Sequence, residues 1–309
     1  MCTAISCYNA YFGRNLDVEH SYGEQVVITP RRYPFSFRHS GLCSSHYAMI
    51  GIAAVIDGTP LYFDAVNECG LAAAGLRFAD NAHYLPSCEN GVASFEFIAW
   101  VLSDCTTVNQ AVDKIQHIAI TDAAFNARVS SSPLHWMIAD AHRSVTVEQT
   151  KAGLQIFENP VGVLTNNPPF DRMLDRLPDF RGLSPSDPVN RFAPTLSLDA
   201  YSRGMGAIGL PGDWSSVSRF VRAAFVKHHA VAQGSAEQRS QCFHILDSVA
   251  QIKGCTVLPD GQCEYTAYTV CYGLKEATCF YKTYDHPTVT AVSLPDNLDG
   301  DRLIRYEMI

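Results

Sequence analysis

Short apolar runs separated by turn dipeptides fill the first eighty residues, and this pattern predicts β-strands. Tyr8-Asn9 separates the first two runs, which is the spacing of a tight hairpin. Asp57-Gly58 separates a later pair in the same way. The strands predicted here are Thr3–Cys7, Ala10–Arg14, Gln25–Thr29, Ala48–Val55, Leu61–Val66 and Leu71–Phe78.

Helical spacing of apolar residues follows, and then a second set of strands. We predict helices over Phe95–Ser103 and Val108–Ile118, the second with Thr107 as its N-cap. The strands predicted after them are Leu134–Ala139, Ser144–Gln149 and Leu154–Phe157, and a short helix is predicted over Phe170–Arg176.

A Pro/Gly/Ser-rich segment, residues 178–214, predicts a long functional loop before the last elements. The helices predicted after it are Val217–His229 and Ala236–Gln251. The strands that follow are Tyr265–Tyr272, Thr278–Tyr284 and Thr288–Ser293. This order predicts an α+β protein whose antiparallel sheets are covered by helices on the outside. We find no linker or repeat, so we expect a single domain over residues 1–309.

Composition narrows the class of protein. Apolar residues make up 47% and charged residues 17%, so the chain can bury a sizeable core. The net charge of −8, without Lys/Arg blocks, argues against nucleic acid and anionic membrane as partners. No signal peptide and no apolar run of about 20 residues is present, so we expect a soluble cytoplasmic protein.

The chain has eleven cysteines, an odd number with no C-x-x-C pair. This pattern argues against a disulfide framework or a structural zinc site, and we predict neither a metal nor a cofactor. We expect ten of the cysteines to be buried, inert thiols. Cys2 is the exception because it directly follows Met1.

Removal of Met1 would give Cys2 both a thiol and a free α-amine. The reference pKa of an α-amine is ~7.7–8.0, against ~10.4 for lysine, so the amine is a usable base near neutral pH. A nucleophile that carries its own base follows the logic of N-terminal covalent catalysis. A neighbouring arginine would favour the thiolate.

Arg14 and Asp17 are the first candidates for charges beside Cys2. If the predicted hairpin forms, the chain after its second strand returns to the N-terminal end of the first. On spacing alone, however, an ordinary surface ion pair worth ~0–1 kcal/mol is the better interpretation.

A set of ordered motifs resembles the choloylglycine hydrolase family, N-terminal-nucleophile amidases that include bile salt hydrolases and penicillin V acylases. The motifs cover essentially the whole chain: Met1-Cys2-Thr3, Phe12–Asp17, Tyr22-Gly23-Glu24, Ile28–Arg31, Tyr62–Glu68, Leu134-His135-Trp136, Val147-Glu148-Gln149, Gly162–Asn166, Gly209–Asp213 and Ser218–Arg222.

The resemblance implies a four-layer αββα sandwich, a nucleophile exposed by loss of Met1, and frequent homotetramers. By motif it makes Cys2 the nucleophile and base, Asp17 the residue that orients the amine, Arg14 and Arg219 neighbours of the thiolate, and Asn166 the oxyanion donor. Without the resemblance, Asn166 would be part of an ordinary pre-proline turn and Arg219 part of a solvated helix face.

One motif departs from the family, and it concerns substrate contacts. The bile salt hydrolase pattern Ala-Gly-Leu-Asn-Phe is Ala74–Phe78 here, with Arg77 in place of the second active-site Asn. Asn81 is not expected to substitute for it. Arg203, in a motif resembling a taurine-associated variant, is a candidate sulfonate partner. The substrate-binding candidates are Arg77, Tyr22, Phe63 and Arg203, with Pro60–Tyr62 and Phe125–Val129 as further apolar walls.

Three hypotheses follow. The first is a bile salt hydrolase that cleaves glycine- or taurine-conjugated bile acids through an acyl-enzyme. The alternative is a penicillin V acylase or N-acyl-homoserine lactone acylase of the same family, for which Arg77 is the best hint. The third is a non-catalytic amphiphile-binding protein. Transfer of the acyl group to an amine is a further activity that such an acyl-enzyme permits.

Overall fold

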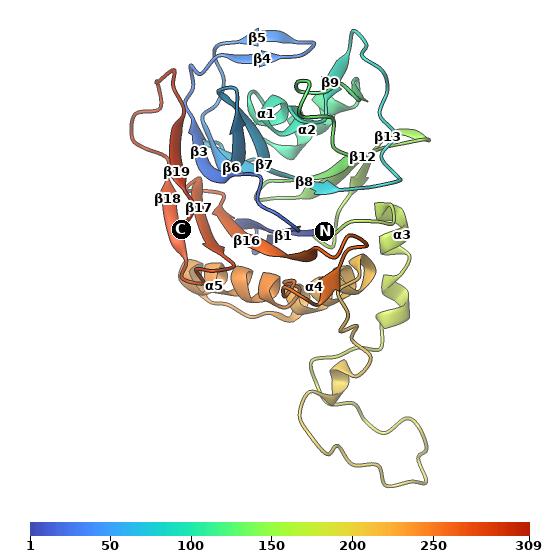
Figure 1. Ribbon diagram of the computed structural model, residues 1–309. Helices are drawn as coiled ribbons and strands as arrows, with labels where there is room; N and C mark the ends of the chain where they lie inside the picture. Colours follow the sequence, from blue (N-terminus) through green and yellow to red (C-terminus); the bar gives the residue numbers. More distant parts are fainter.

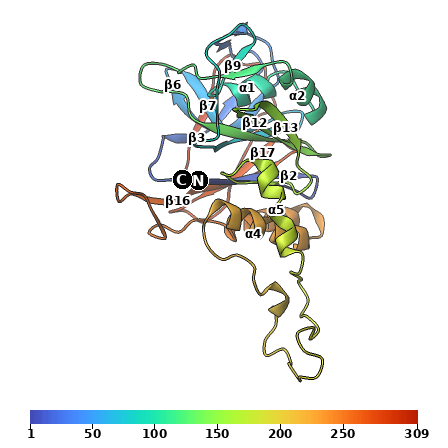
Figure 2. The same ribbon diagram turned by 90° about the vertical axis from the view of Figure 1, so that its right-hand side faces the viewer.

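Two antiparallel β-sheets lie face to face between two helical layers (Figures 1 and 2). The computed structural model describes residues 1–309. Helices α1 (Phe97–Leu102) and α2 (Val108–Ile115) form one outer layer, and α4 (Ser216–His229) and α5 (Gly234–Asp247) form the other. The predicted αββα architecture is confirmed.

The sheet beside α4 and α5 contains the N-terminal strand near its edge. Its order is β14 (Val163–Leu164), β1 (Cys2–Cys7), β2 (Tyr11–Val18), β16 (Cys263–Gly273), β17 (Thr278–Thr283) and β18 (Thr290–Ser293), with β15 (Thr256–Val257) beside β16. The turn between β1 and β2 has Tyr8 and Asn9 both at positive φ, which matches the twist of a tight hairpin.

The other sheet has eight strands and carries α1 and α2 on its outer face (Figure 1). Its order is β13 (Gly153–Glu158), β12 (Ser144–Thr150), β11 (Leu134–Ala139), β8 (Ala72–Arg77), β7 (Thr59–Asn67), β6 (Met49–Ile56), β3 (Glu24–Thr29) and β19 (Ile304–Glu307). The remaining elements are β4 (Phe35–Phe37), β5 (Gly41–Cys43), β9 (Gly91–Ala93), β10 (Ala119–Thr121), α3 (Phe170–Leu174), η1 (Leu177–Phe180) and η2 (Met205–Ala207).

Two apolar cores account for the layering. One lies between the sheets and beneath α4 and α5, and it includes Cys2. The other lies beneath α1 and α2. Strand β2 is buried along its whole length because it is covered on both faces, so its sequence reads as a buried run and not as a clean alternation.

Several predictions needed correction. β19 was missed because its residues are exposed and its partner β3 lies about 280 residues earlier in the chain. α5 ends at Asp247 and not at Gln251. The expectation of ten buried thiols was wrong for five cysteines: Cys69, Cys88 and Cys255 are exposed, and Cys43 and Cys263 are only partly buried. Exposed positions in turns and loops impose no packing constraint on residue type, which is why the sequence pattern failed there.

The segment predicted as a loop extends away from the rest of the molecule (Figures 1 and 2). Apart from η1 and η2 it has no regular structure. Among the helices, none is long and apolar enough to cross a bilayer.

Candidate active site

The β1–β2 register explains why Arg14 meets Cys2. Ala4 pairs with Arg14, and Cys2 pairs with Leu16. Because side chains two residues apart point to the same face of a strand, Cys2 and Arg14 are diagonal neighbours on one face of the sheet. Arg14 Nη2 donates a hydrogen bond to Cys2 Sγ at 2.8 Å.

Arg14 is fully buried, so its charge needs partners inside the protein. Besides Cys2, its Nη1 donates to the carbonyl oxygen of Phe63 at 2.8 Å. It also pairs with the carboxylate of Asp64. Burial alone would lower the pKa of Arg14, but the negative charges of Cys2 and Asp64 raise it. The guanidinium is therefore a permanent cation beside the sulfur.

Asn166 reaches Cys2 because β14 pairs with β1 on the other side. Leu164 is opposite Ala4, which brings Asn166, two residues further, to the level of Cys2. The Cys2 backbone N–H donates to Asn166 Oδ1 at 2.8 Å, and Asn166 Nδ2 donates to the carbonyl oxygen of Arg77 at 2.8 Å. An amide nitrogen has two hydrogens, so one of them remains for another acceptor.

Arg219 comes from the first turn of α4, whose N-cap Ser215 accepts from the backbone of Ser218. It is fully buried, contrary to a solvated helix face. Its Nη1 donates to the carbonyl oxygen of Cys2 at 2.6 Å, and its Nη2 donates to Asn166 Oδ1 at 2.8 Å. Arg219 therefore holds both the backbone of Cys2 and the amide of Asn166 in place.

Asp17 lies beside the start of the chain. Its backbone N–H donates to the Met1 carbonyl at 2.9 Å, and its own carbonyl accepts from the Met1 amine at 2.8 Å. Asp17 Oδ1 accepts from Thr266 Oγ1 at 2.6 Å, whereas Oδ2 is buried without a hydrogen-bond donor. Burial raises the pKa of the Asp17 carboxyl, and the charges of Arg219 and the amine oppose this.

The Met1 amine is also in contact with the carboxylate of Glu264. Burial lowers the pKa of this amine from 8.0, against the attraction of Cys2 and Asp17. An amine with a lowered pKa is a better supply of free base near neutral pH. While Met1 is present, however, the Cys2 nitrogen is an amide and has no basic lone pair.

Three of the substrate-binding candidates lie around this centre. Arg77 is exposed at the end of β8, and its carbonyl is held by Asn166. Tyr22 is 47% exposed, and its ring lies 6.0 Å from that of Phe63. Phe63 in turn is half-buried against the core between the sheets. A cation and two aromatic rings therefore lie at the exposed side of the Cys2 site.

Two other candidates lie elsewhere. Arg203 is exposed on the protruding loop, and the structure of one chain does not bring it to Cys2. Tyr62, a predicted wall residue, is buried in the core beneath α1 and α2, where its hydroxyl meets Thr29 Oγ1 at 2.7 Å. Tyr62 is therefore not available to a ligand at Cys2.

Sequence reasoning missed three polar residues that contact the site: Asp64, Glu264 and Thr266. All three are buried. Asp64 stands in one of the family-like motifs, which was the only signal for it. Glu264 and Thr266 lie more than 240 residues from Cys2, so no local spacing connects them with it.

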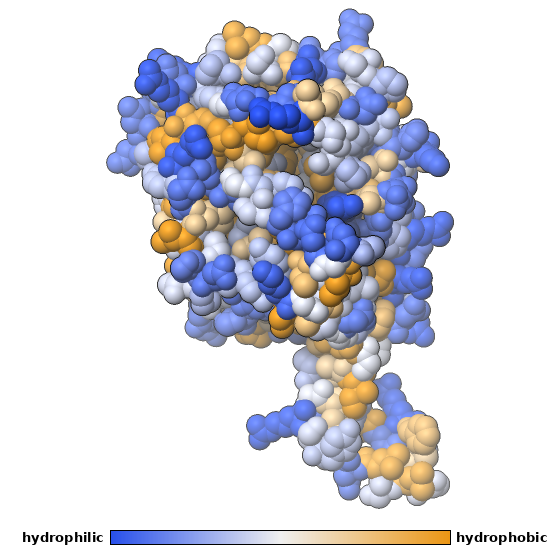
Figure 3. Space-filling model, in the orientation of Figure 1, coloured by the Kyte–Doolittle hydropathy of each residue, from blue (hydrophilic) through white to orange (hydrophobic).

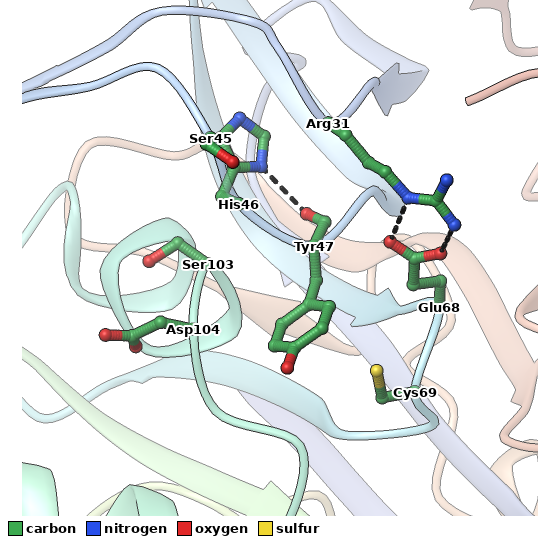
Figure 4. Close-up of a pocket in the computed structure, with 8 residues that line it drawn as sticks. All are labelled: Arg31, Ser45, His46, Tyr47, Glu68, Cys69, Ser103 and Asp104. Atoms are coloured by element: carbon green, nitrogen blue, oxygen red, sulfur yellow. Dashed lines mark hydrogen bonds and ion pairs between the residues drawn. The ribbon is translucent and has the colours of Figure 1, made fainter. Parts of the chain in front are cut away.

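A cavity of about 460 Å³ lies apart from Cys2, and none of the site residues lines it (Figure 4). Arg31 and Glu68 form an ion pair across it, and His46 Nδ1 is hydrogen-bonded to the Tyr47 carbonyl. Only these two contacts join the residues drawn there; Asp104 pairs with Lys114, and Ser103 donates to the Trp100 carbonyl.

The arrangement at Cys2 suits acyl transfer. A thiol with a buried cation at its sulfur, a nearby base after loss of Met1, and a free amide N–H meet the three needs of nucleophile, base and oxyanion donor. No group of His, Cys, Asp and Glu residues in the chain is arranged to hold a metal ion.

Comparison with known proteins agrees with this chemistry. The family model for linear amide C–N hydrolases, choloylglycine hydrolase family, matches residues 2–306. A bile salt hydrolase/transferase from Lactiplantibacillus plantarum is 47% identical, over 100% of this chain and 97% of that protein. A bile salt hydrolase/transferase from Clostridium perfringens is 31% identical, over 99% and 97% of the two chains.

Solved structures show the same fold. The crystal structure of a mutant conjugated bile acid hydrolase from Clostridium perfringens superimposes with a TM-score of 0.92 at 30% identity, covering 100% of this chain and 97% of that one. A penicillin V acylase from Agrobacterium tumefaciens gives a TM-score of 0.77 at 21% identity, covering 99% and 91%. At that identity the second match shows the fold alone.

Proposed function

The chain belongs to the choloylglycine hydrolase family of linear amide C–N hydrolases, and we propose that it hydrolyses the amide bond of glycine- or taurine-conjugated bile acids. The observation that carries the proposal is the contact between Arg14 Nη2 and Cys2 Sγ, at the very start of the chain. The relatives named for bile salt hydrolysis, which match over the full length, support this substrate class.

Acylation begins once Met1 has been removed. The Cys2 thiol gives its proton to its own α-amine, and the sulfur attacks the amide carbonyl carbon to form a C–S bond. The carbonyl oxygen takes up the electron pair, and the free N–H of Asn166 donates to it. The C–N bond then breaks, and the leaving amine takes the proton held by the α-amine.

Deacylation reverses the roles. A water molecule attacks the thioester, its proton passes to the α-amine, and the C–S bond breaks to restore the thiolate beside Arg14. An amine in place of water would form a new amide instead. The printed names of two relatives, hydrolase/transferase, support including this second outcome.

We assign the anionic tail of the substrate to Arg77. It is an exposed cation with no carboxylate within ion-pair distance, and it adjoins Asn166 through its own carbonyl. The charge of Arg77 also lowers the pKa of the terminal amine, although burial lowers this pKa more. Tyr22 and Phe63 offer aromatic faces to the apolar ring system, where burial contributes about 25 cal/mol per Å².

We also propose that the chain forms a homotetramer, as the family resemblance implies, with contacts through the protruding loop. Figure 3 shows apolar atoms at the tip of this loop, and Phe192 and Tyr201 are 88% and 84% exposed. An apolar surface of this kind marks a protein contact. Light scattering on the chain and on Phe192→Ser tests this, because the variant should dissociate.

The deciding experiment measures amine release from taurocholate, glycocholate and penicillin V, using protein whose intact mass shows that Met1 is gone. Release from the bile salts alone supports the proposal. Release from penicillin V alone moves the chain to the acylase alternative. Cys2→Ala should abolish turnover, whereas Cys7→Ala, on the same strand, should retain it; binding without turnover in the intact chain would favour an amphiphile carrier.

A further inference from the structure

The carboxylate of Asp64 is buried directly behind Arg14. Asp64 lies on β7 in the eight-stranded sheet, and its side chain is fully buried. Arg14, on β2 in the other sheet, donates from Nη1 to Asp64 Oδ2 at 3.2 Å. The same guanidinium donates from Nη2 to Cys2 Sγ at 2.8 Å. One cation therefore stands between two groups that carry negative charge.

Two tyrosines of β16 complete the environment of Asp64. Tyr268 donates to Oδ2 at 2.5 Å, and Tyr272 donates to Oδ1. The Tyr272 oxygen also accepts from the backbone N–H of Ile52 at 3.2 Å, so its own hydrogen is left for Asp64. Every neighbour of the two carboxylate oxygens is thus a donor, and the arrangement fits an ionised Asp64.

Burial raises the pKa of Asp64 above its ordinary value, and Arg14 and the two tyrosine hydroxyls oppose this rise. The assignment of an ionised Asp64 therefore rests on its three donors. Burial also raises the pKa of Tyr268 and Tyr272 far above the usual value, so both remain protonated donors.

The reaction cycle changes the charge on sulfur but not on Arg14. In the free enzyme Cys2 Sγ and the Asp64 carboxylate share the guanidinium. In the acyl-enzyme the sulfur is a neutral thioester, and Asp64 is then the one anion in contact with Arg14. A buried cation without a partner strongly destabilises the folded protein. Asp64 therefore contributes most to the stability of Arg14 in the acyl-enzyme, where the sulfur is uncharged.

We propose that Asp64, held by Tyr268 and Tyr272, is a positioning residue that keeps Arg14 paired through the reaction cycle and limits how strongly Arg14 stabilises the Cys2 thiolate. This proposal rests on the proposed amidase chemistry of Cys2. It acts through Arg14 and involves no contact between Asp64 and substrate.

The test is the pH dependence of Cys2 alkylation by iodoacetamide, which needs no substrate. In Asp64→Asn the opposing charge is gone, so the pH of half-maximal alkylation should fall by about one unit. The turnover number should fall at least roughly 10-fold, because the thiolate is less basic and Arg14 loses its partner in the thioester. KM should stay within threefold.

The other charges that face Cys2 come from β2, α4, β8 and the chain terminus, and they are unchanged in this variant: Arg14, Asp17, Arg219, Arg77 and the terminal amine.

Tyr268→Phe keeps the carboxylate but removes one of its donors. Asp64 should then interact more strongly with Arg14, which leaves Arg14 less able to stabilise the Cys2 thiolate. Half-maximal alkylation of Cys2 should therefore move to higher pH. The matched control is Thr269→Val, which removes a hydrogen bond to Asn15 Oδ1 at 2.9 Å next to Tyr268 in the same strand. It should lower stability without moving the alkylation profile.

An unchanged alkylation profile in Asp64→Asn with lowered stability would make Asp64 merely structural and overturn the proposal. If Asp64→Asn does not fold, Tyr268→Phe decides alone, and a shift to lower pH or no shift overturns it. Alkylation is read by mass on the peptide that contains Cys2, apart from the exposed thiols of Cys69, Cys88 and Cys255. A wrong substrate assignment would therefore appear as absent turnover in the unchanged chain and would not affect this outcome.

Discussion

Asn166→Ala removes the side chain that joins Cys2, Arg219 and the β8 end. Three hydrogen bonds are lost: from the Cys2 N–H, from Arg219 Nη2 and to the Arg77 carbonyl, each at 2.8 Å. It also removes the free N–H that we assign to the oxyanion. Loss of one such donor typically costs ~3–4 kcal/mol in the transition state, or roughly 10²–10³ in turnover number.

The assay is amine release from a conjugated bile acid, with kcat and KM determined separately. KM should change little, because the oxyanion forms only in the transition state. Urea unfolding should show a loss of about 1–3 kcal/mol, because two buried donors lose their acceptor.

Two further variants separate donation from positioning. Asn166→Asp keeps oxygen acceptors for Cys2 and Arg219 but places a negative charge where the oxyanion forms, so it should be stable and inactive. Asn167→Ala is the matched control, because that neighbour bonds only to the Ala79 carbonyl. The reasoning is refuted if Asn166→Ala keeps kcat within tenfold of the unchanged chain, or if Asn166→Asp turns over normally.

Three other outcomes are expected. Arg77→Ala should raise KM for conjugates with an anionic tail roughly 10-fold or more, through loss of a charge-assisted contact, but not for an uncharged amide of the same acid; equal effects on both would contradict the assignment. His135→Leu should lower the free energy of unfolding by roughly 2–3 kcal/mol in urea, because the buried Glu148 carboxylate and the Thr165 carbonyl each lose their hydrogen bond to the imidazole; a change under 1 kcal/mol would show that these hydrogen bonds are dispensable. Hydrogen bonds from Ser215 and Ser218 lower the pKa of Asp213 to about 2. The stability difference between the unchanged chain and Asp213→Asn should therefore be full above about pH 4 and vanish as the pH falls toward 2. This difference in stability should stay under ~1 kcal/mol because Asp213 is exposed. A stability difference that grows on acidification would contradict the prediction.

Local sequence was enough to predict the hairpin and the helix start at Thr107. Tyr8 and Asn9 both adopt positive φ, as expected for a tight turn, but Ala10 also belongs to the connection, so Cys7 pairs with Tyr11. This extra residue shifts the register by one from that of the predicted two-residue loop. That register alone places Arg14 beside Cys2. The Thr107 side chain accepts from the Gln110 N–H, as a capping residue should. Each of these features depends on a few neighbouring residues, so their pattern is visible in the chain.

The rest of the site was decided by tertiary structure. Asn166 and Arg219 lie 164 and 217 residues from Cys2 in sequence, and spacing alone favoured a turn and a solvated helix face for them. Only the pairing of β14 with β1 and the packing of α4 bring them to the backbone of Cys2. Resemblance to a family identified these residues, but it did not identify Asp64, whose role arises from two sheets meeting face to face. A buried charge is stable only where distant elements supply its partners, and a one-dimensional pattern of polar and apolar residues does not contain that information.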